Sequence, residues 1–150
     1  MAGGTATQVY LMTPDKIKVR IKEDKSLTTP IAADRIKMMV ADRRRSASLV
    51  RKTFRRRDIV TRNGERGGDI PGSNILFEKT AGPMTPTRGR AFDRIGLEVV
   101  NLEAFCKKLE DAGIKFENPY RKAGNMNAAF AVFQDPYGTL IELSEGLSTK

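Results

Sequence analysis

The chain has 150 residues, a formal net charge of +9 and no histidine. A chain of this length can bury the core of one domain, so we expect a single domain over residues 1–150. Without histidine, neither a His-based catalytic triad nor a His-ligated zinc or iron site can form.

No apolar run comes near the roughly 20 residues that span a bilayer, which predicts no membrane insertion. The N-terminal residues lack the basic and apolar regions of a secretory signal. The single cysteine, Cys106, cannot form an internal disulfide, and this favours a cytoplasmic protein. The positive charge attracts nucleic acid, acidic membrane surfaces and small acidic ligands alike, so charge alone does not identify the partner.

Two short strands are predicted over residues 7–27, joined by a turn at residues 13–15. In the second strand Ile17, Val19 and Ile21 alternate with basic residues, which predicts a half-buried strand with a cationic outer face. A lone hairpin exposes its strand edges. We therefore expect this hairpin to join a sheet of its own chain or of a second copy, and the latter arrangement would give a homodimer.

A third strand is predicted to end at Val40, and Asp42 follows as the expected N-cap of a basic amphipathic helix. The apolar side of this helix consists of Ala47, Val50 and Phe54. A short strand near residues 58–62, a glycine-rich turn and a strand over residues 74–79 follow. The glycines lack the spacing of a phosphate-binding loop, so they are interpreted as turn residues.

The second half of the chain repeats this order of elements. A strand over residues 91–100 precedes a helix that Asn101 caps and Gly113 ends. The apolar stripe of the helix consists of Leu102, Phe105, Cys106 and Leu109. This position predicts that Cys106 is a core residue rather than a reactive thiol.

Three further elements complete the second half. We predict a strand over residues 114–117, a loop at residues 118–120 and a closing hairpin within residues 130–147. The sequence Asp-Pro-Tyr-Gly at residues 135–138 is the expected turn of that hairpin.

The chain also matches itself at two places. Residues 33–36 correspond to residues 92–95, and residues 15–27 correspond to residues 135–147. Each half is therefore interpreted as one βαβββ module, and the N-terminal hairpin as the tail of a third, truncated module.

The segments DRIGLEVVNLEAFCKKLEDAGIKFENPYRKAG and FAVFQDPYGTLIELSEGL resemble the C-terminal module of glyoxalase/bleomycin-resistance/dioxygenase proteins of the vicinal oxygen chelate superfamily. The resemblance implies an α+β fold in which two modules, residues 31–80 and 90–147, pair into a cup-shaped, mostly antiparallel sheet with outer helices. The N-terminal hairpin is an addition to that plan. In the family the cup holds a divalent metal, bound by a residue of the opening strand and a residue of the closing strand of each module.

The ligand positions that the resemblance implies have mostly changed. The family's usual D-H-I-G stands here as D-R-I-G, so Arg94 replaces one histidine and Arg35 replaces the other. Leu76 replaces the closing-strand carboxylate of the first module, and only Glu142 remains. In the N-terminal hairpin the same alignment places Lys22 opposite Glu142. Guanidinium groups offer no lone pair, so we expect no metal and no other cofactor.

Arg35, Arg94 and Glu142 are the candidate ligand-binding residues. Two planar guanidiniums can grip the carboxylate or phosphate of a small anionic molecule, with Glu142 setting their orientation. The alternative is a charge-compensated network that fills an obsolete metal site. A further alternative is a metal-dependent lyase or dioxygenase of the same superfamily with ligands elsewhere, so whether the protein is an enzyme stays open and no catalytic residue is assigned.

The densest charge lies in residues 43–57, which hold eight basic residues in fifteen. Arg44, Arg51 and Arg55 are expected to bind polyanions nonspecifically, because such a stripe can contact phosphate backbones. Phe54 belongs to the helix core, so no stacking platform for single strands is evident. A basic-surface polyanion-binding protein is thus the second alternative function, and a merely solvated helix face is the simpler interpretation.

Overall fold

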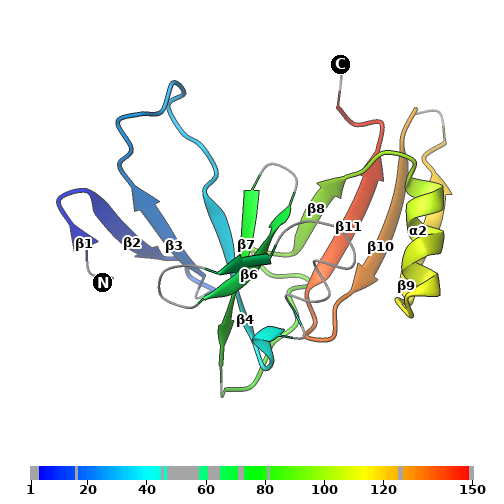
Figure 1. The fold of residues 1–150 in the computed structure, drawn as a ribbon, viewed down its shortest axis with the longest axis horizontal. Helices are drawn as coiled ribbons and strands as arrows, with labels where there is room; N and C mark the ends of the chain where they lie inside the picture. Colours follow the sequence, from blue (N-terminus) through cyan, green and yellow to red (C-terminus); the bar gives the residue numbers. More distant parts are fainter. Residues whose placement is uncertain are drawn as a thin grey trace.

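The computed structural model describes residues 4–15, 17–44, 46, 58–60, 65–70, 73–80, 82–124 and 127–148. Within these residues the strands form three sheets, which lie one after another along the long axis of the molecule (Figure 1). No helix of this part of the chain is long and apolar enough to cross a membrane.

The hairpin sheet has the strand order β1-β2-β3. Its strands are β1 (Gly4–Thr5), β2 (Gln8–Met12) and β3 (Lys18–Lys22). The two predicted strands are present, and β1 adds a short third one. Within the described residues this sheet pairs with neither of the others, so the expectation that it joins another sheet of its own chain is wrong. Half-burial of the second strand is also wrong, because Val19 and Ile21 are 40% and 51% exposed.

Contacts at its turn anchor the hairpin sheet to the rest of the chain. The backbone N–H of Ala91 donates to the Asp15 carboxylate at 2.8 Å, and the Arg90 guanidinium donates to the Asp15 carbonyl oxygen at 3.1 Å. The hydrogen bond from Ala91 is the main reason why the pKa of Asp15 is lowered. The hairpin turn is therefore held beside the segment that leads into the second module.

The first sheet has the order β4-β7-β6-β5 and the second sheet the order β8-β11-β10-β9. The first consists of β4 (Arg35–Val40), β5 (Asp58–Val60), β6 (Arg66–Ile70) and β7 (Ser73–Lys79). The second consists of β8 (Arg94–Glu98), β9 (Phe116–Lys122), β10 (Ala129–Gln134) and β11 (Leu140–Glu145). In each sheet the opening strand pairs parallel with the last strand and the other pairs are antiparallel. This confirms the predicted fold class of paired βαβββ modules with an extra hairpin.

Helix α2 (Leu102–Asp111) covers one face of the second sheet (Figure 1). The Asn101 side chain accepts a hydrogen bond from the backbone N–H of Ala104, as predicted for the N-cap. The Glu145 carboxylate accepts from the backbone N–H groups of Asn101 and Leu102, which ties the helix to β11. The predicted stripe is buried at Leu102, Cys106 and Leu109. It packs on a core that includes Ile95, Leu97, Ala131, Phe133 and Leu143.

The structure differs from the sequence prediction at β9. Residues 118–120 were expected to form a loop, but they lie within β9, so that prediction is wrong. Pro119 is tolerated there because β9 is the edge strand of its sheet and its pairing with β10 shifts register.

Of the predicted basic helix, Arg43, Arg44 and Ser46 are helical. Its predicted apolar side, Ala47, Val50 and Phe54, lies outside the described residues.

Candidate functional site

Arg94 and Glu142 lie on the face of the second sheet that points away from α2. In the parallel pairing of β8 with β11, Arg94 is opposite Leu140 and Gly96 is opposite Glu142. The intervening Ile95 points into the core beneath α2, so strand alternation places Arg94, Gly96 and Glu142 on the other face. We call these three residues the open face of the second sheet.

Two carboxylates hold the Arg94 guanidinium. Its Nε donates to Asp93 and its Nη1 donates to Glu142, each at 2.7 Å. Hydrogen bonds from Arg94 to Asp93 and then to Glu142 raise the pKa of Arg94, so the guanidinium stays protonated. The pKa of Asp93 is lowered, first by the backbone N–H of Gly89 and then by Arg94. Among the described residues, the other N–H groups of Arg94 have no protein partner.

The space beside this cluster is open. A Cβ atom added to Gly96 would meet no heavy atom within 4 Å. The side chains of Arg94 and Glu142 are 44% and 29% exposed. A small molecule can therefore reach both groups from the open face.

Arg35 has a different set of partners on the first sheet. Its Nε and Nη2 donate to the two oxygens of Asp34 at 2.8 and 3.3 Å. Arg20 of the hairpin sheet donates to Asp34 at 2.9 Å. These contacts, led by the hydrogen bond from Arg35, lower the pKa of Asp34. Within the described residues no hydrogen bond or ion pair joins this cluster to Arg94 or Glu142.

Leu76 lies at the place in the first sheet that Glu142 holds in the second. Asn74 is opposite Arg35 and Leu76 is opposite Lys37, which reproduces the pairing of β8 with β11. Leu76 is 1% exposed. Lys22, which the internal alignment equates with Glu142, lies on β3 and pairs with Gln8 of β2.

Lys37 and Arg20 belong to none of the motifs in the sequence. Lys37 Nζ lies 2.5 Å from a Glu65 oxygen and 3.2 Å from a Glu78 oxygen. Both carboxylates, Glu65 first, raise the pKa of Lys37. Strand alternation could have placed Lys37 on the same face as Arg35, two residues earlier. Arg20 gave no such signal, because its partner Asp34 precedes β4 and lies far from β3 in the sequence.

The donor set does not fit the metal that the fold family implies. Of the four positions that the resemblance assigns to metal ligands, two hold guanidinium groups, which offer no lone pair, and one holds the aliphatic side chain of Leu76. The remaining carboxylate, Glu142, already accepts a hydrogen bond from Arg94. No group of three or more Cys, Asp or Glu side chains is placed to hold a metal in the described part of the chain. A hard or borderline cation would find a single carboxylate among these four positions, with the positive charge of Arg94 next to it.

Cys106 takes no part in such a site. It is buried, and burial followed by the nearby charge of Glu110 raises its pKa to about 11. The thiol is therefore protonated and unreactive at neutral pH, in agreement with its predicted place in the core.

Residues 34–143 match the model of the Glyoxalase/Bleomycin resistance protein/Dioxygenase superfamily. The search of curated proteins gives no match. Among solved structures, the chain is similar to the fosfomycin resistance protein FosX from Listeria monocytogenes, with a TM-score of 0.63 and 16% identity over 80% of this chain and 95% of that one. For the oxidase ChaP-H2 the TM-score is 0.64, with 16% identity over 78% and 94% of the two chains.

A third solved structure is an integron cassette protein of V. cholerae. Its TM-score is 0.61, and the identity is 18% over 79% of this chain and 98% of that one. At such identities these structures show a common fold and nothing further about chemistry.

Proposed function

The chain belongs to the glyoxalase/bleomycin resistance protein/dioxygenase superfamily, and from this premise we propose that it binds a small anionic molecule without a resident metal. Arg35 and Arg94 are the proposed donors. Glu142 is proposed to orient Arg94 rather than to act as a base.

The observation that carries this proposal is the sharing of Asp34 by two guanidiniums. Arg35 and Arg20 both donate to that one carboxylate, so two cations face a single anion and one positive charge is left over. Their side chains are 37% and 34% exposed, which leaves them accessible. Charge-assisted hydrogen bonds from guanidiniums are among the stronger contacts that a carboxylate or phosphate can receive.

The rival interpretation is a compensated charge network with no ligand. The Arg94 cluster supports it better than the Arg35 cluster does, because Arg94 faces two carboxylates. The open space beside Gly96 supports the binding proposal, because it gives a small molecule access to the Arg94 guanidinium. A metal-dependent lyase or dioxygenase is disfavoured by the donor set described above.

Titration calorimetry with small carboxylates and phosphates tests the proposal. Fosfomycin belongs in the panel because one structural neighbour is a fosfomycin resistance protein. Arg35→Met and Arg94→Met should each cost about 1.5–3 kcal/mol of binding free energy, or about tenfold or more in affinity. Arg121→Met is the matched control, as it removes the same charge from an exposed position on β9, the strand of the second sheet farthest from Arg94.

Two results would reject the anion site. One is that no acid binds the parent protein at millimolar concentration. The other is that Arg35→Met and Arg94→Met bind an acid as tightly as Arg121→Met does. In either case the arginines form a charge-compensated network that binds no ligand.

We also propose a homodimer in which a second copy covers the hairpin sheet. Val9 pairs with Ile21 and Leu11 pairs with Val19, so these four side chains share one face, and they are 40–51% exposed. Exposed contiguous apolar faces are typical of interaction surfaces. Sedimentation should show a dimer that Val19→Lys together with Ile21→Lys dissociates, while Lys18→Gln on the opposite face leaves it intact. A monomeric parent protein would refute this.

A further inference from the structure

The two faces of the hairpin sheet differ in character. The sheet lies at one end of the molecule, where Figure 1 draws it in blue. In the pairing of β2 with β3, six residues alternate with the exposed apolar ones, so they share the opposite face. We call this the cationic face, and it consists of Gln8, Tyr10, Met12, Lys18, Arg20 and Lys22.

Positive charge dominates the cationic face. Lys18, Arg20 and Lys22 occupy every second position of β3, which is exposed along its whole length. Neither β2 nor β3 contains an acidic residue. Within the described residues, Lys18 and Lys22 form no ion pair. The two lysines therefore present their charges to the solvent.

Two acids near these cations do not neutralise them. Asp34 accepts a hydrogen bond from Arg20, but it accepts one from Arg35 as well. The pKa of Asp24 is lowered mainly by hydrogen bonds within its own turn, and the charge of Lys22 adds to this effect. The cationic face thus keeps a net positive charge.

The aromatic ring on this face is already in use. Lys18 Nζ lies 4.4 Å from the centroid of the Tyr10 ring, and the Tyr10 hydroxyl accepts a hydrogen bond from Gln8 at 3.1 Å. The half-buried ring therefore offers little surface on which a nucleotide base could stack. It instead holds the Lys18 ammonium group in place.

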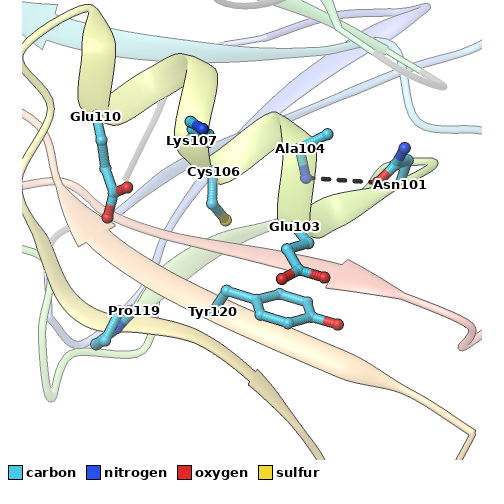
Figure 2. A pocket seen from close by; sticks show the side chains of 8 residues that line it. All are labelled: Asn101, Glu103, Ala104, Cys106, Lys107, Glu110, Pro119 and Tyr120. Atoms are coloured by element: carbon cyan, nitrogen blue, oxygen red, sulfur yellow. Dashed lines mark hydrogen bonds between the residues drawn. The ribbon is translucent and has the colours of Figure 1, made fainter.

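The groove between α2 and β9 shows the contrast (Figure 2). Glu103 and Glu110 line it together with Lys107, so charges of both signs lie side by side. Opposite charges at such short range cancel each other's field at a distance. A polyanion is therefore attracted to the cationic face rather than to this groove.

We propose that the cationic face binds double-stranded DNA, with β2 and β3 inserted as a two-stranded ribbon into the major groove. That groove is about 12 Å wide and admits such a ribbon, whose strands are about 4.8 Å apart. The apolar face of the hairpin stays available to a second copy of the chain.

The spacing of the three cations suits this arrangement. The Cα atoms of Lys18 and Lys22 are about 13 Å apart, so the lysines reach phosphates on the rims while Arg20 between them faces the bases. Asp34 accepts from one nitrogen of Arg20. The rest of the guanidinium is left to donate to the edge of a guanine.

Fluorescence anisotropy of the full chain with a labelled DNA duplex of mixed sequence tests the proposal. An RNA duplex and a DNA single strand are the comparison ligands. The DNA duplex should bind about tenfold or more tightly than either, because an RNA duplex has a deep, narrow major groove and a single strand has none. Amide chemical shifts of β2 and β3 should change when the DNA duplex is added.

Removing a lysine should change the salt dependence of binding. Lys18→Gln and Lys22→Gln should each reduce the slope of log affinity against log salt concentration by about one. Lys115→Gln is the matched control, because it removes the same charge from an exposed position outside the hairpin sheet. It should leave the slope unchanged.

The basic segment is separated from the hairpin by repeating these titrations with Arg44, Arg51 and Arg55 changed to glutamine. The effects of Lys18→Gln and Lys22→Gln should persist in that variant. The proposal is wrong if duplex binding disappears there, if the RNA duplex or the single strand binds as tightly as the DNA duplex, or if Lys115→Gln reduces the slope as much as Lys18→Gln.

Discussion

The first and second sheets have the same strand order but different residues at equivalent places. In the second sheet Glu142 is opposite Val132, whereas in the first sheet the equivalent Leu76 is opposite Gly67. A methyl group on Gly67 would overlap the Ile75 carbonyl oxygen and lie 2.8 Å from Leu76 Cδ2. The absent side chain at residue 67 thus leaves room for Leu76 to be buried. One backbone plan therefore produces an apolar contact in one module and a charged, half-exposed one in the other.

The two Asp-Arg pairs differ in their third partner. Asp34 is shared by Arg35 and Arg20, which gives two cations and one anion. Arg94 is shared by Asp93 and Glu142, which gives one cation and two anions. Equivalent positions in a repeat thus need not have equivalent electrostatics, because the third partner comes from a different element in each case.

The largest difference between the two sheets should come from adding a methyl group at Gly67 or at Gly96. Gly67→Ala should cost about 3 kcal/mol or more, or prevent folding, because the new Cβ meets backbone that cannot move aside. Gly96→Ala should change stability by no more than about 0.5 kcal/mol, since nothing occupies that space. Urea denaturation of both variants measures this, and equal losses would contradict the contrast.

Truncation at the equivalent positions should give the next largest difference. Leu76→Ala removes a fully buried side chain and should cost about 2–5 kcal/mol. Glu142→Gln keeps the volume and loses one partly exposed ion pair, which is worth less than about 1 kcal/mol. If Glu142→Gln proves the more damaging substitution, the charged cluster is a structural element of the fold.

The basic segment between β4 and β5 should affect binding and hardly affect stability. Changing Arg44, Arg51 and Arg55 together to glutamine should lower the salt needed to elute the protein from heparin or DNA. Its melting temperature should stay nearly the same, because charges on a solvated helix face, which the sequence pattern predicts here, contribute little to stability. Unfolding of this triple variant would mean that the segment packs against another part of the protein.

Added divalent metal should have the smallest effect of all. Neither sheet offers more than one suitable oxygen at the family's ligand positions, so Mn²⁺, Zn²⁺ or Ni²⁺ should leave the melting temperature unchanged within error. Thermal scans with and without chelator provide the measurement. A clear upward shift, abolished by Glu142→Gln, would restore the metal-dependent enzyme as the leading function.

Local pattern was enough to predict most of the elements. The alternation in residues 17–22 and the apolar stripe from Leu102 to Leu109 follow from strand and helix periods, which depend on neighbours in the chain. Asn101 could be predicted as the N-cap for the same reason. Pro119 misled the prediction of β9, because only the sheet order shows that this strand lies at an edge.

The repeated order of elements and the helix α2 could be predicted from the sequence, since they depend on residue type and on repeats along the chain. Three features depend on how the elements pack: the contact of Arg20 with Asp34, the place of Lys37 between two glutamates, and the packing of α2 against β9. Each of these contacts joins residues from different elements. The partner of a charged side chain depends on which strands and helices pack together. Burial and sheet register fix that packing through many weak contacts, which no local pattern in the sequence specifies.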